Sequence, residues 1–258
     1  MDKSLLEMLV KIAQFLALPF RFPKLANRII PWAFTQRPMI SELARLADHA
    51  NWYRSKGFNT VIDVGANIGA YCFAMRALLP EVNIYAFEPI PECYERLNSN
   101  LNEMGKFKAF HTAVGNHSGT TKFHHNAFHA SSSILAMDKA HERIFPSTSQ
   151  SEVINVPITR LDEYINQIEL EPPVLLKIDV QGYEDQVLLG AEMLLTKVDF
   201  ILTEVSYISL YKGQPLFDDI YYLLKARGFQ FMGNQEVLLN KKNGDIIQSD
   251  AIFMHTKR

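Results

Sequence analysis

Short apolar runs recur along the chain and are separated by segments with helical periodicity. The runs predict strands over residues 60–64, 82–87, 107–114, 174–179 and 200–205. The segments between them predict helices over residues 69–79, 91–104, 184–195 and 216–227. Two more strands, 229–232 and 251–255, are predicted to form an antiparallel hairpin at the sheet edge. This alternation predicts an α/β fold with a doubly wound, mostly parallel seven-stranded sheet.

Two segments depart from this alternation. Residues 115–172 are rich in glycine, serine, histidine and asparagine, with strand-like pieces only at 121–123 and 153–158. We therefore predict an irregular insertion there, over one edge of the ligand site. Residues 1–58 are predicted to form a helical extension, with a helix over 39–55 that is capped by Gly57. The rest of the chain, residues 59–258, is predicted to form one domain.

The first 22 residues predict an amphipathic helix, because Leu5, Leu9, Ile12 and Leu16 recur at helical spacing. Its apolar stretch is too short to span a bilayer. The basic character of this region leaves two interpretations open. Residues 1–30 would either contact an anionic membrane surface peripherally or pack against the domain or a second copy in a homo-oligomer.

Charge and cysteine content narrow the function classes. The chain has 26 lysine and arginine residues against 28 aspartate and glutamate residues. This near-neutral balance argues against nucleic acid as a partner. The two cysteines, Cys72 and Cys93, lack partners at metal-ligand spacing, which fits a reducing, cytoplasmic setting.

A glycine turn follows the first predicted strand, in the sequence Val61-Ile62-Asp63-Val64-Gly65-Ala66-Asn67-Ile68-Gly69. Glycine lets the backbone approach a ligand closely, and a helix N-terminus offers N–H groups to an anion. Dinucleotide sites carry Gly-x-Gly-x-x-Gly, whereas Asn67 stands at the second glycine position here. The motif therefore favours S-adenosylmethionine. We expect Gly65, Ala66, Asn67 and Gly69 to shape its site and Asp63 to meet the ammonium group of its methionine part.

Residues at the ends of the next two predicted strands extend this site. Glu88 directly follows the second strand, where an acid can accept hydrogen bonds from both hydroxyls of a ribose. Pro89 comes next in the chain. Ala113 and Val114 end the third strand, where the adenine ring would lie. We therefore assign Glu88, Pro89, Ala113 and Val114 to the cofactor site.

Charged residues interrupt two later apolar strands. Asp179 ends one strand, Glu184 begins the helix after it, and Glu204 lies near the end of the next strand. Charges in buried strands need a partner or a function, so these three acids are the candidate catalytic residues. Asp179 is also expected to contact the cofactor. Asp179 and Glu204 could act as a general base, orient the acceptor hydroxyl or hold a divalent cation such as Mg²⁺. Glu184 could equally be an acid at the start of a helix.

Histidines cluster in the predicted insertion, at His124, His125 and His129. They lack the cysteine partners or the His-Glu-x-x-His pattern of a zinc site. The cluster therefore predicts a polar loop, in which one histidine could take the acceptor proton.

Several motifs follow one another in a fixed order between about residues 60 and 231. They are Asp63-Val64-Gly65-Ala66-Asn67-Ile68-Gly69, Phe87-Glu88-Pro89, Ala113-Val114-Gly115, Ser131-Ser132-Ser133, Val156-Pro157-Ile158-Thr159-Arg160-Leu161-Asp162-Glu163, Lys177-Ile178-Asp179-Val180-Gln181-Gly182-Tyr183-Glu184, Glu204-Val205 and Leu210-Tyr211-Lys212-Gly213-Gln214-Pro215. In this combination the chain resembles the FkbM-type methyltransferase family. The resemblance implies S-adenosylmethionine as cofactor and O-methylation of a sugar, a glycan or a small natural product. Gln181 departs from the glutamate that is frequent in the family.

Two other functions remain as alternatives. A nicotinamide-dependent oxidoreductase would explain the fold and Glu88, but not Asn67 in the glycine turn. A non-catalytic binding or scaffold module would keep the fold without an acceptor pocket, because fold alone does not fix chemistry.

Overall fold

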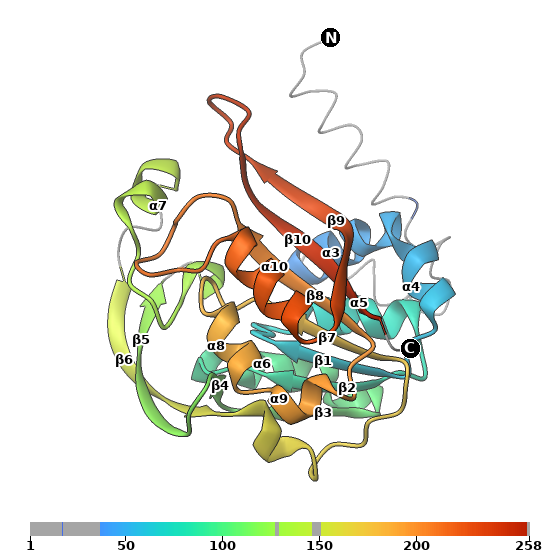
Figure 1. Cartoon of the computed structure of the whole chain (residues 1–258). Helices are drawn as coiled ribbons and strands as arrows, with labels where there is room; N and C mark the ends of the chain where they lie inside the picture. Colours follow the sequence, from blue (N-terminus) through green and yellow to red (C-terminus); the bar gives the residue numbers. More distant parts are fainter. Residues whose placement is uncertain (1–16, 18–36, 127–128, 146–150, 257–258) are drawn as a thin grey trace.

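The computed structural model of the protein describes residues 17, 37–126, 129–145 and 151–256 (Figure 1). A seven-stranded sheet forms its centre, with the strand order β3-β2-β1-β7-β8-β10-β9. The strands are β1 (Thr60–Val64), β2 (Asn83–Phe87), β3 (Phe107–Phe110), β7 (Val174–Ile178), β8 (Phe200–Ser206), β9 (Phe229–Leu239) and β10 (Ile246–His255). The pairs from β3 to β8 are parallel, and β10 pairs antiparallel with both β8 and β9. The predicted fold class is therefore confirmed.

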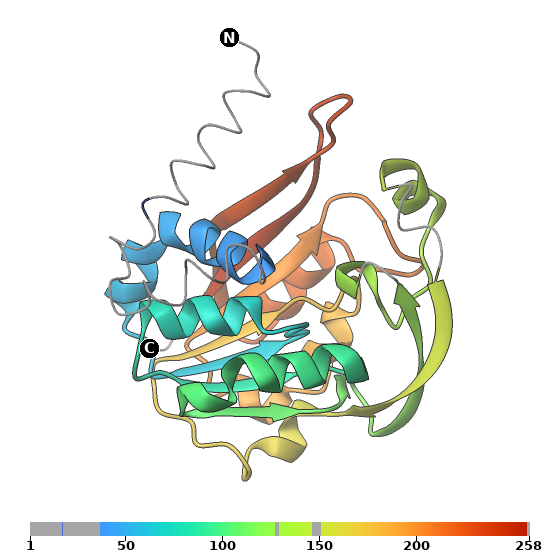
Figure 2. The same ribbon diagram turned by 180° about the vertical axis from the view of Figure 1, so that it is seen from behind.

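Helices cover both faces of this sheet (Figures 1 and 2). One face carries α3 (Arg37–Asp48), α4 (Ala50–Lys56), α5 (Ala70–Leu78) and α6 (Pro91–Leu101), and the other carries α8 (Glu184–Leu189), α9 (Glu192–Leu195) and α10 (Phe217–Ala226). Every residue of β1 is buried, and consecutive side chains enter opposite layers. Val61 packs in the cluster with α5, while Ile62 packs in the cluster with α8 and α10. The continuous apolar pattern of β1 thus follows from its burial on both faces.

The helical extension contributes to the same core. Met39, Leu43 and Leu46 of α3 are at most 1% exposed and pack in the cluster that holds α5. Burying each such side chain contributes about 1.5–3 kcal/mol, so residues 37–56 are an integral layer of the domain. The predicted helix over 39–55 is interrupted at His49, between α3 and α4. Gly57 caps α4 in the left-handed conformation, as predicted.

The predicted insertion is more regular than expected. It contains β5 (Gly119–Asn126) and β6 (Ser151–Thr159), which pair with each other in antiparallel orientation. A second sheet forms because β4 (Ala113–Val114) pairs parallel with β6. The strand-like pieces predicted at 121–123 and 153–158 lie within β5 and β6, which are longer than expected. The segment also holds a short helix, α7 (Lys139–Ile144), and the 3-10 turns η3 (His129–Ser131) and η5 (Leu161–Tyr164). The strand predicted over 107–114 is split, because β3 pairs with β2 whereas β4 pairs with β6.

A second predicted element is split by glycine. The helix expected over 184–195 is divided into α8 and α9 around Gly190. A Cβ at Gly190 would lie 1.9 Å from the carbonyl oxygen of Gly115. The break thus lets the chain pass close to the start of the insertion.

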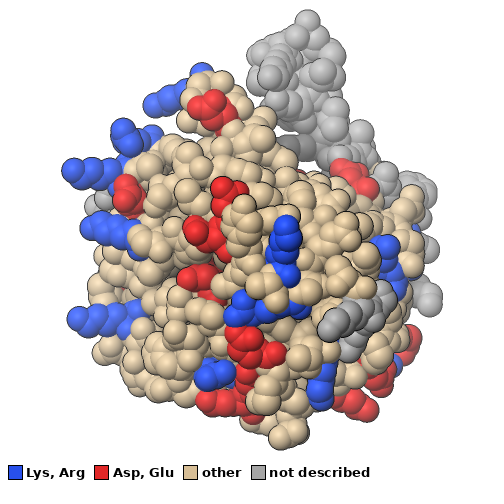
Figure 3. Space-filling view, in the orientation of Figure 1, with Lys and Arg blue, Asp and Glu red and all other residues tan. Residues whose placement is uncertain are grey.

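Two predictions concern the surface. The expected helix over the first 22 residues, and the membrane or oligomer contact of residues 1–30, lie outside the described residues apart from Ala17. Within the described part of the chain, every helix is too short or too polar to cross a membrane. On the face shown in Figure 3, acidic side chains lie among the basic ones, so the described residues form no continuous basic surface there.

Candidate functional site

A cavity opens at the carboxyl ends of β1, β2 and β7. It encloses about 700 Å³ of empty space, including the open solvent at its mouth. Seven residues predicted for the site line it: Gly65, Asn67, Glu88, Pro89, Ala113, Val114 and Asp179. Five other predicted residues are outside its lining: Asp63, Ala66, Gly69, Glu184 and Glu204. The residues predicted from the sequence therefore indicate where the cavity lies, although five of them are not part of its lining.

The glycine turn after β1 has an unusual backbone. The φ angle is 83° at Gly65, 50° at Asn67 and 86° at Gly69. These are positive, left-handed values, which glycine adopts more readily than residues with a side chain. A Cβ on Gly65 would lie 1.9 Å from the carbonyl oxygen of Asp179. The N–H groups of Gly65 and Ala66 both donate to the carbonyl oxygen of Phe87 at 3.0 Å. These two amides thus tie the turn to β2 and are not available to an anion in this structure.

Glu88 is held by the backbone on both sides. Its Oε2 accepts the N–H of Asn67 at 2.7 Å, and its Oε1 accepts the N–H of Ile90 at 2.8 Å. The side chain lines the cavity although the residue is only 3% exposed. Burial raises the pKa of Glu88 to about 7, against the opposing effect of the two N–H groups. An orientation fixed from two sides suits a carboxylate that must meet two hydroxyls.

Asp63 does not face the cavity. It is completely buried, its Oδ1 lies 3.1 Å from Nζ of Lys177, and its Oδ2 accepts the thiol of Cys72 at 3.1 Å. Burial raises the pKa of Asp63, while Lys177 opposes that shift. Asp63 lies outside the cavity lining, and its contact with a ligand ammonium stays a prediction. In this structure Asp63 anchors Lys177 beneath the site, because a buried charge needs a partner.

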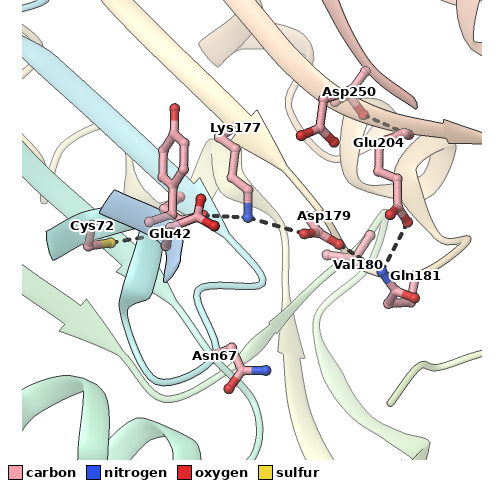
Figure 4. A network of polar contacts seen from close by, with 12 residues as sticks. Glu42, Asn67, Cys72, Lys177, Asp179, Val180, Gln181, Glu204 and Asp250 are labelled. Atoms are coloured by element: carbon pink, nitrogen blue, oxygen red, sulfur yellow. Dashed lines mark hydrogen bonds and ion pairs between the residues drawn. The ribbon is translucent and has the colours of Figure 1, made fainter. Parts of the chain in front are cut away.

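A chain of polar contacts leads from Lys177 to the next strands (Figure 4). Nζ of Lys177 lies 3.4 Å from Oδ2 of Asp179. Nε2 of Gln181 donates to Oδ1 of Asp179 at 2.9 Å and to Oε2 of Glu204 at 3.0 Å. Asp179 and Glu204 thus converge as predicted, but through an amide. Glu204 lies behind Gln181, and burial raises its pKa well above the usual range, with Asp179 and Glu184 adding to the effect.

Glu184 has a local role in this loop. Its Oε1 accepts the N–H groups of Val180 at 3.2 Å and Gly182 at 3.1 Å. The residue is 3% exposed, and burial raises its pKa to about 7. The carboxyl of Glu184 thus holds the loop that carries Gln181 and lies outside the cavity lining, so its catalytic role stays a prediction.

The donor set does not fit the expected Mg²⁺. A divalent cation between Asp179 and Glu204 would need oxygen ligands around it. Nε2 of Gln181 occupies the position between the two carboxyl groups and points N–H donors at both. Within the described residues there is no group of three histidine, cysteine or acidic side chains that could hold a metal ion.

One histidine of the predicted cluster lines the cavity. This is His129, whose Nδ1 lies 3.2 Å from Nε2 of His125. Burial lowers the pKa of His129, and His125 adds to the effect. His125 also contacts Oε1 of Glu152 at 3.2 Å, and His124 pairs with Ser133 through the backbone. His124 and His125 lie in β5 rather than in the predicted polar loop, whereas one histidine of the cluster does lie at the cavity.

Sequence reasoning missed the part of the wall that comes from distant segments. These lining residues include Thr112, Phe123, Ser132, Ile134 and Gln181. Tyr211 belongs to the segment 206–217, whose aromatic side chains are predicted from the sequence to shape the acceptor pocket. Its hydroxyl donates to Oε1 of Gln181 at 2.9 Å. Besides this segment, the predicted insertion, the departure at Gln181 and the Ser131-Ser132-Ser133 motif pointed to this part of the wall.

The comparison with protein families decides the classification. A family model described as the methyltransferase FkbM domain matches residues 63–231. The chain belongs to this family. The matched segment contains the glycine turn, Glu88, Asp179 and Glu204, whereas α3 and β10 lie outside it. The predicted resemblance is thereby confirmed, and the oxidoreductase alternative loses its support.

Two of the curated relatives that the chain matches are named as methyltransferases. The chain is 29% identical over 160 residues to the 2-O-methyltransferase NoeI of Sinorhizobium fredii, covering 60% of this chain and 66% of that protein. It is 27% identical over 144 residues to the hexuronic acid methyltransferase AglP of Haloferax volcanii, covering 55% and 54%. The chain thus spans just under two thirds of the first relative and about half of the second.

Solved structures of other methyltransferases are also similar. One is the magnesium protoporphyrin IX methyltransferase ChlM of Synechocystis PCC 6803, solved with bound SAM. The likeness has a TM-score of 0.47 and 9% identity, and it covers 86% of this chain and 84% of that one.

Proposed function

We propose that this FkbM-domain protein transfers the methyl group of S-adenosylmethionine to a hydroxyl oxygen of a sugar, a glycan or a small natural product. The observation that carries the proposal is the backbone-held carboxylate of Glu88 on the wall of a cavity that also exposes Asp179. Bound S-adenosylmethionine would supply an activated methyl group, and the protein would align the reactants and accept a proton.

The wall near β1 and β2 suits the nucleoside part of this cofactor. A carboxylate offers about four acceptor positions, of which the N–H groups of Asn67 and Ile90 use two on Glu88. The others remain for the two hydroxyls of a ribose. Thr112, Ala113 and Val114 line the adjoining wall and provide a small, largely apolar surface for an adenine ring.

Asp179 is the best candidate for the group that accepts the proton. It lines the cavity, and its side chain is 37% exposed although Lys177 and Gln181 hold it from behind. A general base must reach the proton that it abstracts, so geometry favours Asp179 over the buried Glu204 and Glu184. In this proposal the acceptor hydroxyl gives its proton to an Oδ atom of Asp179 as the oxygen attacks the methyl group.

The cavity wall favours an uncharged acceptor. Phe123 and Ile134 of the insertion give it apolar surface, and its titratable side chains are Glu88, Asp179 and His129. No lysine or arginine of the described residues lines it. An anionic acceptor would lack a counter-charge there, so a neutral sugar hydroxyl fits better.

Transfer of a labelled methyl group tests the proposal. The full chain would be incubated with methyl-labelled S-adenosylmethionine and a panel of neutral sugars, hexuronic acids and glycans. We expect label in a neutral sugar or glycan, as an alkali-stable ether. Binding of S-adenosylmethionine without transfer to any acceptor would favour the non-catalytic module. Quenching of NADH fluorescence without binding of S-adenosylmethionine would instead support the nicotinamide-dependent oxidoreductase.

A further inference from the structure

Gln181 lines the cavity and connects several segments of its wall. Its side chain makes three hydrogen bonds: Nε2 donates to Asp179 and Glu204, and Oε1 accepts the hydroxyl of Tyr211 at 2.9 Å. Its carbonyl oxygen accepts the hydroxyl of Ser133 at 2.7 Å. One residue thereby joins the ends of β7 and β8, the loop after β8 and the insertion.

The backbone of Gln181 is held in a costly conformation. Its φ angle is 58°, in a left-handed region that costs a residue with a side chain about 1–2 kcal/mol. The loop is nevertheless fixed, because Glu184 accepts the N–H groups of Val180 and Gly182 on either side. A fixed, strained residue whose side chain contacts a cavity-lining acid is typical of a functional site.

The chemistry of this position calls for a neutral amide. Two N–H donors must face the carboxyl groups of Asp179 and Glu204, and one acceptor must face Tyr211. A glutamate would offer no donor in its ionised form, and a lysine or arginine would offer no acceptor. The hydroxyl of Tyr211 selects the orientation of the amide, because it donates to Oε1 and leaves Nε2 for the carboxyl groups.

Other charged groups surround this contact. Lys177 of β7 approaches Asp179 on the side opposite to Gln181, and Asp250 of β10 lies opposite Glu204 in the sheet register. Asp250 is in turn paired with Arg45 of α3, with 2.9 Å between Nη1 and Oδ2. Gln181 is the neutral member of a group that is otherwise charged or acidic. Its removal would let the carboxyl groups of Asp179 and Glu204 face each other directly.

We infer that Gln181 is a positioning residue, whose amide turns the carboxylate of Asp179 toward the place of the transferred methyl group. This inference rests on the proposed function. It adds to that function a requirement for a neutral amide at position 181, oriented by Tyr211. The role of Gln181 is indirect, because Asp179 would be the group that takes the proton.

Two cofactor analogues test this inference without a known acceptor. S-adenosylhomocysteine lacks the methyl group, and sinefungin carries an amine at the place of that methyl. A well-oriented Asp179 would bind the amine of sinefungin, so the ratio of the two dissociation constants reports its orientation. Calorimetry with the wild-type chain should show that sinefungin binds at least tenfold more tightly. In Gln181→Met this preference should largely disappear, while the affinity for S-adenosylhomocysteine changes less than threefold.

Two further variants separate positioning from folding. Tyr211→Phe removes the hydroxyl that orients the amide and should reduce the sinefungin preference two- to fivefold. Gln214 is a matched control, because its buried amide accepts the N–H groups of Leu210 and Tyr211 and donates to Ser206 without lining the cavity. Gln214→Met should lower the melting temperature and leave the sinefungin preference unchanged.

Each result decides between the claims. Failure of the folded wild type to bind S-adenosylhomocysteine would overturn the proposed function, and this inference with it. Equal binding of both analogues by the wild type would overturn the inference alone. The inference would also be overturned if Gln181→Met kept the same preference for sinefungin as the wild type, or if Gln214→Met lost that preference.

Discussion

Glu88 and Asp179 are two acids at the ends of β2 and β7, the strands that flank β1, and the protein holds them in different ways. Glu88 is 3% exposed, and backbone N–H groups contact both of its oxygens. The side chain of Asp179 is 37% exposed, and the side chains of Lys177 and Gln181 contact it. A carboxylate held by backbone is fixed by the fold itself. The position of a carboxylate held by side chains depends on each of those partners. Substitutions should therefore affect the cavity differently around Glu88 and around Asp179.

The largest effect is expected at Asp179. In Asp179→Asn the amide cannot take the acceptor proton, so methyl transfer should fall by about 10²–10⁴-fold. Binding of S-adenosylmethionine should change little, because Glu88 and the glycine turn are untouched. Asp185→Asn is the control, since that carboxylate accepts a hydrogen bond from its neighbour Gln186 and does not line the cavity. Near-normal transfer by Asp179→Asn would remove Asp179 as the proton acceptor.

The glycine turn should show the next largest effect, on stability. Gly65→Ala places a Cβ 1.9 Å from the carbonyl oxygen of Asp179. Urea unfolding should therefore show a loss of about 2–4 kcal/mol in the free energy of unfolding. Gly57→Ala is the matched control, because Gly57 also has a positive φ but open space around its Cα. That control should lose only about 1 kcal/mol, and equal losses would contradict steric exclusion at Gly65.

The pH dependence of cofactor binding should identify the backbone-held acid. Burial raises the pKa of Glu88 to about 7 in the free protein. Ribose hydroxyls donate to the ionised form, so the cofactor competes with a proton and binding strengthens as the pH rises through that pKa. Calorimetry should show about tenfold weaker binding near pH 6 than near pH 8. Glu88→Gln should flatten this dependence, and an unchanged slope in that variant would assign the effect to another group.

The part of the cavity around Asn67 and Glu88, which is proposed to bind the cofactor, was largely predictable from the sequence because its contacts are local. Asn67 and Glu88 follow adjacent parallel strands, and the turn that carries Asn67 has glycine with positive φ at positions 65 and 69. The ion pair of Asp63 with Lys177 was not predictable from the sequence. A strand-end acid can face either the ligand or a buried cation, and the sequence alone did not show that Lys177 reaches back to it.

The part of the cavity around Asp179 and Gln181, which is proposed to bind the acceptor, was less predictable because its contacts join residues far apart in the sequence. The amide of Gln181 contacts Glu204 and Tyr211, which are 23 and 30 residues away. The strands β5 and β6 were underestimated because their outer faces carry polar and histidine side chains, which weaken the apolar alternation of a strand. Pairing across the insertion, rather than local propensity, fixes these strands.

The central claim is that Glu88 marks a binding site for S-adenosylmethionine. Calorimetric titration of the wild-type chain and Glu88→Ala in parallel tests it most directly, with Glu92→Ala of the exposed start of α6 as a control. We predict micromolar binding by the wild type and the control, and about tenfold weaker binding by Glu88→Ala, a difference of about 1.4 kcal/mol. A folded wild-type chain that does not bind the cofactor, or equal binding by all three proteins, would contradict the claim.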